Sequence, residues 1–258
     1  MRSFALASGS SGNCFFIENE SGIKVLVDLG LSFGKTKEIL ESRNIDINSI
    51  NAIFITHEHS DHIKGFDIFL KKLDCDFYIS KGTYEGLNDN YDEFLDKIKF
   101  VKNHSLIDLS GVRVFVVEKS HDSKEAVSFV FDDGKKKIGI FTDLGEVSNE
   151  IKHILRTLDV VYFEANYCED YINKNCRHMS PNYLNRLMSN KGHLSLKQSI
   201  DCLKEVAKNG QRIVLCHVSE NTNFYENAYL QIRDALNSIE LFPEIFVSFQ
   251  GEACEWIE

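Results

Sequence analysis

The sequence predicts a mixed α/β protein in which helices cover the outer faces of β-sheets, giving a four-layer αββα sandwich. Short runs rich in β-branched and aromatic residues recur along the 258 residues, and segments with helical spacing of apolar residues become more frequent in the second half. Several of the strand-like runs are followed directly by histidine or aspartate, as expected where strands end at one edge of a sheet. Both observations favour sheets that carry a polar site along an edge.

The elements follow from these patterns in chain order. The first half is predicted to consist mainly of strands, at 14–17, 24–27, 50–56, 77–79, 112–117, 126–131 and 137–141, with a helix at 34–43. Asp132-Asp133-Gly134, between the last two strands, is a strong hairpin signal. The second half is predicted to alternate helices at 147–155, 181–188, 195–208 and 228–239 with strands at 160–163, 212–215 and 244–249.

Composition indicates one domain over 1–258. Hydrophobic residues make up 43% of the chain, and the two prolines leave no proline-rich linker. The amino-terminal residues lack a continuous apolar core, and no stretch approaches the length of a membrane span. Seven cysteines without a Cys-x-x-Cys pair fit reduced thiols. We therefore expect a cytoplasmic protein that does not insert into a membrane.

The strand at 50–56 is followed by a dense group of metal-binding side chains. His57, His59, Asp61 and His62 all fall within six residues. Imidazole nitrogen and carboxylate oxygen suit zinc, manganese or iron. Because one ion cannot comfortably use all four groups, the motif predicts a hydrolytic centre with two metals. The alternative is a solvated polar loop, which does not account for this density of ligands.

Three further candidates occupy the same place relative to other strands. His121 follows the strand at 112–117, Asp143 follows 137–141, and His217 follows 212–215. Segments distant in sequence can converge where strands end at one edge, and we expect these side chains to join the first group. Cys216 precedes His217 at a strand end and should point to the opposite side, so we interpret it as structural.

The order of these motifs resembles the metallo-β-lactamase fold hydrolases along nearly the whole chain. The landmarks are Asp28, the motif from His57 to His62, His121, Asp143 and His217. The ligand set that the resemblance implies is divided between a first ion (His57, His59, His121), a second ion (Asp61, His62, His217) and a bridge between both (Asp143). Asp28 would orient ligands, as carboxylates beside metal-binding imidazoles do. The ions would be zinc or manganese, which both accept this set.

Further segments resemble the YycJ (WalJ) branch of that family, whose members are regarded as nucleases. They are the loop Ser8-Gly9-Ser10-Ser11-Gly12-Asn13 and the segments 163–166, 192–195 and 215–219. Glu164 and His193 resemble a pair in the tRNase Z and phosphodiesterase branches, where the histidine lies beside the scissile phosphate. The resemblance implies that Glu164 orients His193. Tyr167 occupies the position where the branch has a histidine.

Charge gives two opposing indications about the substrate. A formal net charge of -10 argues against strong nonspecific binding of nucleic acid. From 171 to 200, however, there is no aspartate or glutamate, and this stretch contains Arg177, Arg186 and Lys191, which are candidate phosphate contacts. Ser10 and Asn13 are further candidates. The alternative is that the basic residues form solvated helix faces and that the first loop is only a hairpin entry.

We therefore predict a two-metal phosphodiester hydrolase in which Asp61, His193 and Glu164 take part in catalysis. The leading function is a 5′ to 3′ DNA exonuclease with a role in DNA repair, so that nucleic acid is the expected partner. An RNA-processing nuclease and a small-molecule phosphodiesterase remain alternatives, since the metal centre does not distinguish these substrates. Intact ligands without turnover on any phosphodiester would indicate a nonenzymatic metal-binding module.

Overall fold

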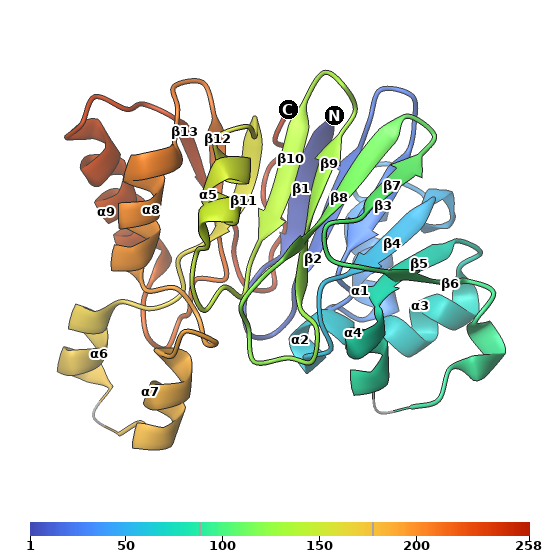
Figure 1. The fold of residues 1–258 in the computed structure, drawn as a ribbon, viewed down its shortest axis with the longest axis horizontal. Helices are drawn as coiled ribbons and strands as arrows, with labels where there is room; N and C mark the ends of the chain where they lie inside the picture. The colour runs from blue at the N-terminus through green and yellow to red at the C-terminus, as the bar shows by residue number, and fades with distance from the viewer. Residues whose placement is uncertain (88, 177) are drawn as a thin grey trace. The chain divides into compact units, whose positions relative to one another are not determined.

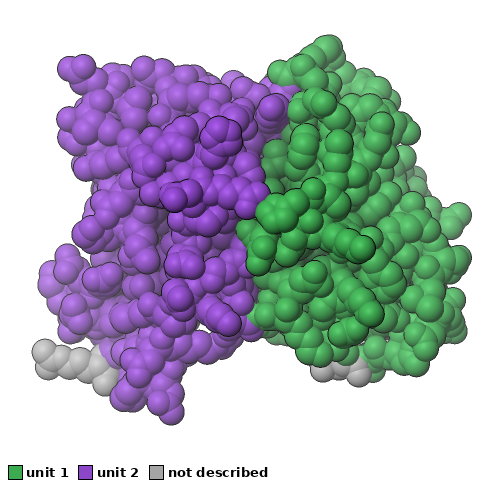
Figure 2. Space-filling view, viewed as in Figure 1, with its two compact units in different colours: residues 1–118, 123–135, 250–258 green, residues 119–122, 136–249 purple. Residues whose placement is uncertain are grey.

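A computed structural model describes residues 1–87, 89–176 and 178–258. The chain divides into two compact units, which Figure 2 shows in different colours. Unit 1 comprises 1–118, 123–135 and 250–258, and unit 2 comprises 119–122 and 136–249. The predicted metal-binding motif that begins at His57 lies in unit 1, whereas His121, Asp143 and His217 lie in unit 2. That 1–258 form a single domain stays a prediction.

Unit 1 contains a six-stranded sheet with the strand order β1-β2-β3-β4-β5-β6. Its strands are β1 (Arg2–Ala7), β2 (Cys14–Glu18), β3 (Lys24–Val27), β4 (Ala52–Ile55), β5 (Asp76–Ser80) and β6 (Ile98–Val101). The first three pair antiparallel, and β3 to β6 pair parallel. Because β3 and β4 run in parallel, their carboxyl ends meet at one edge of the sheet, where polar residues follow both.

Short helices connect the parallel strands of unit 1 (Figure 1). They are α1 (Phe33–Glu41), α2 (Ser60–Ile63), α3 (Phe66–Lys72), α4 (Lys81–Gly86) and the 3-10 helices η1 (Ile47–Ser49) and η2 (Asp92–Phe94). Serine side chains cap two of them: Ser32 accepts from the backbone of α1, and Ser80 accepts from that of α4. These caps satisfy backbone N–H groups that have no partner within the helix.

The remaining strands of unit 1 are β7 (Leu106–Leu109), β8 (Val112–Glu118) and β9 (Val127–Asp132), which pair antiparallel in this order. The core of the unit lies between β9 and the six-stranded sheet. The ring of Phe54 on β4 contacts Phe129 and Phe131 on β9 at centroid distances of 5.1 and 5.2 Å. Alternate residues of β9 thus face the sheet that carries the metal-binding motif.

Unit 2 contains four parallel strands, β10 (Lys137–Phe141), β11 (Val160–Glu164), β12 (Arg212–Cys216) and β13 (Glu244–Val247). All five residues of β11 are buried, as expected for a central parallel strand. The helices are α5 (Asn149–Leu155), α6 (Glu169–Asn175), α7 (Pro181–Leu187), α8 (Leu196–Val206) and α9 (Tyr225–Asn237). α8 packs against both α5 and α9, and α9 against β13 (Figure 1). Among the described helices, none is long and apolar enough to span a membrane.

Most predicted elements are confirmed within a few residues of their ends. The strand at 137–141 is confirmed with the same bounds, and the helix predicted at 228–239 runs from Tyr225 to Asn237. The pattern did not predict β1, β6, β7, α2, α3, α4 or α6. These elements have four to seven residues. Length alone does not explain the misses, because β3, β13 and α5 are as short and were predicted.

Candidate metal centre

In unit 1, the ends of β3 and β4 supply the residues that orient the metal-binding motif. Asp28 follows β3 with a left-handed backbone (φ 62°) and is fully buried. Such a φ is strained for a residue other than glycine and is common at functional sites. The Asp28 carboxylate accepts from the backbone N–H and the hydroxyl of Thr56, which follows β4, at 2.8 and 2.9 Å. One buried carboxylate therefore joins the two strand ends.

This carboxylate also determines where two imidazoles carry their hydrogens. His62 Nδ1 lies 2.8 Å from Asp28 Oδ2, so Nδ1 donates and Nε2 presents its lone pair. Thr56 gives its hydroxyl hydrogen to Asp28, so the hydroxyl accepts from His57 Nδ1 at 3.0 Å. His57 Nε2 then presents a lone pair as well. Asp28 thus leaves both rings in the form in which Nε2 can bind a metal.

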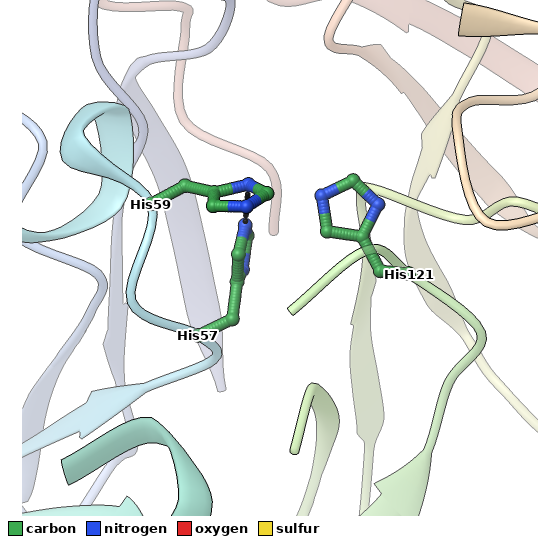
Figure 3. A group of neighbouring side chains, drawn as sticks. All are labelled: His57, His59 and His121. Carbon is green, nitrogen blue, oxygen red and sulfur yellow. Dashed lines mark hydrogen bonds between the residues drawn. The ribbon is translucent and has the colours of Figure 1, made fainter. Parts of the chain in front are cut away.

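The imidazoles of His57 and His59 face one another (Figure 3). His57 Nε2 lies 3.2 Å from His59 Nδ1. His59 precedes α2, whereas Asp61 and His62 lie within its single turn. His62 Nε2 lies 3.5 Å from Asp61 Oδ2. Unit 1 therefore presents two pairs of ligand atoms, one before α2 and one on it.

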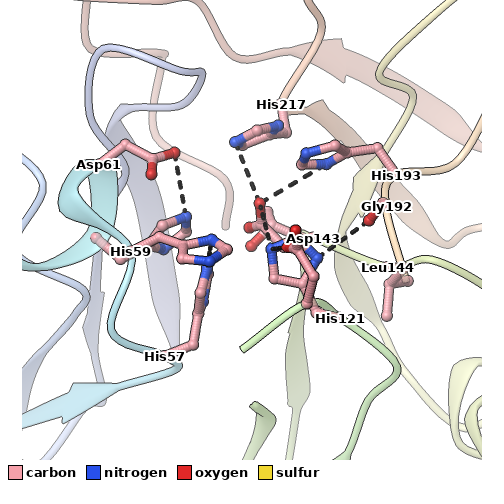
Figure 4. Close-up of polar contacts among 12 residues, drawn as sticks. His57, His59, Asp61, His121, Asp143, Leu144, Gly192, His193 and His217 are labelled. Atoms are coloured by element: carbon pink, nitrogen blue, oxygen red, sulfur yellow. Dashed lines mark hydrogen bonds and ion pairs between the residues drawn. The ribbon is translucent and has the colours of Figure 1, made fainter. Parts of the chain in front are cut away.

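Unit 2 supplies its candidates from the ends of three parallel strands. Asp143 follows β10, Glu164 ends β11, and His217 follows β12. Asp143 and His217 have left-handed backbones, with φ of 56° and 52°. Asp143 Oδ1 lies 3.4 Å from His217 Nε2 and 3.8 Å from His193 Nδ1 (Figure 4). The parallel register brings these side chains together because adjacent parallel strands end at the same edge.

Glu164 is fully buried and holds His193. Its Oε1 accepts from His193 Nδ1 at 2.7 Å, and its Oε2 accepts from the backbone N–H of Leu144 at 2.7 Å. The Leu144 contact connects Glu164 to the residue that follows Asp143. His193 keeps 19% of its side chain exposed. The arrangement fixes one ring nitrogen of His193 and leaves the ring partly exposed.

His121 is oriented by the segment that carries His193. Its Nδ1 donates to Gly192 O at 3.0 Å, so Nε2 presents a lone pair; this nitrogen lies 3.9 Å from Asp143 Oδ1 (Figure 4). A Cβ on Gly192 would lie 2.2 Å from Leu187 O, and a Cβ on Gly145 would lie 2.1 Å from Asn190 O. Only glycine permits these close approaches of backbone to backbone.

These donor atoms fit divalent metal ions. In unit 2, Asp143, Glu164, His193 and His217 each offer a ligand atom, and all four atoms lie within 4.8 Å of one another. In unit 1, two rings present Nε2 lone pairs because Asp28 controls their hydrogens. A mixed set of imidazole nitrogen and carboxylate oxygen suits zinc or manganese. Each unit therefore contains a group of histidines and aspartates able to bind metal.

Comparison with known proteins shows the family of the chain. Residues 24–218 match the family model described as a beta-lactamase superfamily domain. The chain belongs to this family and is a metallo-β-lactamase fold hydrolase. Its two mixed sheets with helices confirm the predicted α/β fold class.

Two curated relatives of the hydrolase carry the same functional name. Exodeoxyribonuclease YycJ of Bacillus anthracis is 28% identical over 233 residues, covering 90% of this chain and 87% of that protein. Exodeoxyribonuclease WalJ of Streptococcus pneumoniae is 30% identical over 243 residues, covering 92% and 88%. The predicted resemblance to the YycJ (WalJ) branch is confirmed. The crystal structure of Zn²⁺-bound PqqB from Methylobacterium extorquens is similar in fold, with a TM-score of 0.73 and 14% identity over 99% of this chain and 100% of that chain.

The residues predicted to contact substrate lie in different environments in the hydrolase. Ser10 and Lys191 are exposed, whereas Asn13 is fully buried. Arg186 on α7 is exposed over 61% of its side chain and donates through Nε to Asp122 Oδ2. Asp122 directly follows His121, and its Oδ1 lies 3.4 Å from His121 Nε2. Arg177 lies outside the described residues.

Tyr167, the departure from the branch pattern, lies in a packed cluster rather than at the surface. It is 3% exposed and packs with Ile172, Cys176 and Leu187 of the α6–α7 region. Burial is the main cause that raises the pKa of its hydroxyl, and the charge of Glu169 raises it further. The aromatic ring thus contributes to the packing of two short helices, a role that does not require a substrate.

Asn166 is a site residue that sequence reasoning missed. Its Nδ2 lies 2.8 Å from His217 Nδ1 and donates to His217 O at 2.9 Å. Asn166 follows β11, two residues after Glu164. The signal was present, since the segment 163–166 resembles the family, but asparagine after a strand also suits an ordinary turn. Only the folded chain brings it to a histidine 51 residues away.

Proposed function

We propose that this hydrolase is a two-metal phosphodiester hydrolase that acts on DNA as a 5′ to 3′ exonuclease. The observation that carries the proposal is the contact between Glu164 and His193, at 2.7 Å, with His193 Nδ1 3.8 Å from Asp143 Oδ1. An imidazole held by a buried carboxylate beside a candidate metal ligand is suited to stabilise charge on a phosphate. The exodeoxyribonuclease names of two relatives support DNA as the polymer.

The proposal includes the ligand set predicted from the sequence. A first zinc or manganese ion would use His57, His59 and His121, a second would use Asp61, His62 and His217, and Asp143 would contribute to both. Bound in this way, the ions would supply Lewis-acid stabilisation of a phosphoryl oxygen and a water-derived nucleophile at neutral pH.

The chain's own residues have distinct roles in this scheme. Glu164 keeps His193 in one orientation, because the carboxylate accepts from Nδ1. His193 Nε2 then donates to a non-bridging or leaving oxygen of the phosphate. Asp28 keeps the hydrogen of His62 on Nδ1. Asp61 would hold the second ion with its carboxylate.

A second candidate, hydrolysis of a small phosphodiester or of an RNA end, is favoured by the charge distribution. The net charge of -10 opposes binding of a long polyanion. Arg186, one of the candidate phosphate contacts, is already paired with Asp122. A short substrate needs fewer phosphate contacts than a duplex. A role in DNA repair and a cytoplasmic location belong to the leading proposal.

The test follows products over time from a 5′-phosphorylated, internally labelled DNA duplex and a matched RNA. Purified protein is supplied with manganese or zinc, and Asp143→Asn serves as the control. We expect stepwise release of mononucleotides from DNA that disappears in the variant. Cleavage of RNA alone, or of a simple phosphodiester with neither polymer cut, would replace the DNA exonuclease with the second candidate.

A further inference from the structure

Asn13, in the loop between β1 and β2, has a side chain whose orientation is fixed. It is fully buried. Its Oδ1 accepts from the backbone N–H of Gly9 at 3.0 Å and from the hydroxyl of Ser8 at 3.0 Å, and its Nδ2 donates to Gly9 O at 3.1 Å. A backbone N–H only donates and a carbonyl only accepts, so rotating the amide by half a turn would break both contacts with Gly9.

The fixed amide points its Nδ2 at two candidate metal ligands on α2. Nδ2 lies 3.2 Å from Asp61 Oδ2 and 3.1 Å from His62 Nε2. Asp28 keeps the hydrogen of His62 on Nδ1, so Nε2 is an acceptor and can receive a hydrogen from the amide. Of the two amide hydrogens, one serves Gly9 O, and the other faces both the Asp61 carboxylate and the His62 nitrogen.

The backbone holds Asn13 against α2 as firmly as the side chain does. Asn13 N donates to Asp61 O at 2.8 Å, and Gly30 N donates to Asn13 O at 2.9 Å. A Cβ on Gly30 would lie 1.8 Å from Asp61 O and 2.4 Å from Asn13 N. The loop, the chain after β3 and α2 are therefore in direct backbone contact, and Asn13 cannot turn outward without separating them.

We propose that Asn13 is a positioning residue that orients the Asp61 carboxylate for the second metal ion. Its amide hydrogen limits rotation of the Asp61 carboxylate, whose Oδ2 lies 3.2 Å from Asn13 Nδ2. An ion held by His62 would take the Nε2 lone pair, so the amide would then support Asp61 alone. This inference rests on the proposed ligand set. It replaces the substrate contact predicted from the sequence, because a buried amide that faces the ligands is not available to a phosphate.

The first experiment measures zinc affinity without any nucleic acid. Asn13→Ala is titrated with zinc against a chromophoric chelator, and the exposed Ser10→Ala in the same loop is the matched control. Loss of a group that supports ligands typically weakens metal affinity or activity by about 10–100-fold. We expect a loss in that range for the second equivalent of zinc, an unchanged first equivalent and wild-type affinities in Ser10→Ala. Wild-type affinity for both equivalents in Asn13→Ala would overturn the proposal.

Kinetics separate positioning from substrate contact. With a phosphodiester that the wild type hydrolyses, Asn13→Ala should show an unchanged KM at saturating metal and a kcat that recovers as metal is raised. A raised KM with unchanged zinc affinity would instead assign Asn13 to the substrate. The zinc titration uses no phosphodiester, so failure of the exonuclease proposal and failure of this inference are distinguishable.

A second variant keeps the test decisive if Asn13→Ala does not fold. Asn13→Asp retains the acceptor for Gly9 N and Ser8 but places a carboxylate oxygen beside Asp61. Like charges at this distance destabilise the metal-free protein and are relieved by a cation. We expect zinc to raise the Tm of Asn13→Asp by at least about 3 °C more than it raises the wild-type Tm. An equal rise in both proteins would overturn the proposal.

Discussion

Glu164→Gln tests how a buried carboxylate supports His193. In the native protein, one oxygen accepts from His193 Nδ1 and the other from Leu144 N, both at 2.7 Å. Glutamine keeps the shape but replaces one acceptor with an NH₂ group. If the NH₂ faces Leu144, two donors meet in a fully buried position. If it faces His193, the ring must move its hydrogen to Nε2, and the contact between the ring and a carboxylate is lost.

The magnitude follows from these two arrangements. A buried donor without an acceptor costs about 1–3 kcal/mol, and the ring can avoid part of this cost by changing its tautomer. We therefore expect a loss of about 1 kcal/mol in stability, which lowers Tm by about 2–4 °C in a protein of this size. Loss of the charge-assisted contact in the transition state should lower kcat by about 10–100-fold.

The assay combines thermal unfolding with steady-state kinetics and zinc content on the same preparations. Glu169→Gln, at the exposed start of α6, is the control for removing one negative charge. It should retain wild-type Tm and kcat. The reasoning would be refuted if Glu164→Gln kept kcat within about twofold of wild type with full metal content, because the carboxylate would then contribute nothing to His193.

Further predictions address the metal ligands, the acid, the basic stretch and the core. His193→Ala should keep its metal but lose most turnover, whereas loss of metal would make His193 a ligand. Asp143→Asn should lower metal content measured by elemental analysis, and full content with normal turnover would contradict its proposed role. If Arg186 leaves Asp122 to contact a phosphate of DNA, Arg186→Ala should lower the slope of log affinity against log salt concentration by about one. An unchanged slope would mean that Arg186 only forms an ion pair with Asp122. Burial raises the pKa of the Cys202 thiol from 9.0 to about 12. As pH rises, the Cys202 thiol therefore loses its proton in the unfolded chain at a lower pH than in the folded protein. The contribution of Cys202 to the free energy of unfolding is at its maximum below pH 9 and falls by about 1.4 kcal/mol per pH unit as pH rises towards 12. The free energy of unfolding in urea should fall less steeply above pH 9 in Cys202→Ala than in the wild type. Equal slopes in both proteins would contradict this linkage.

The predicted fold class is confirmed, whereas the predicted ligand set stays a prediction. Asp28, Asp143 and His217 lie within two residues of strand ends, and these positions were predictable because each follows an apolar run. Their left-handed backbones could not be predicted, since most aspartate and histidine residues have a negative φ. β6 was not predicted because its buried residues, Ile98 and Val101, do not alternate with exposed ones.

Ligand identity in this hydrolase is a local property of the chain, and the sequence by itself determined the candidates. The supporting contacts were decided only by tertiary structure. In the sequence, Asn13 is a residue of a loop rich in glycine and serine. In the structure, its amide faces Asp61, which lies 48 residues further along the chain. The sequence predicts that Arg186 contacts a phosphate, whereas in the structure Arg186 forms an ion pair with Asp122. Hydrogen bonds between segments far apart in the sequence produce no periodic pattern of residues from which they could be predicted. Their partners become neighbours only when the chain folds and the strands align.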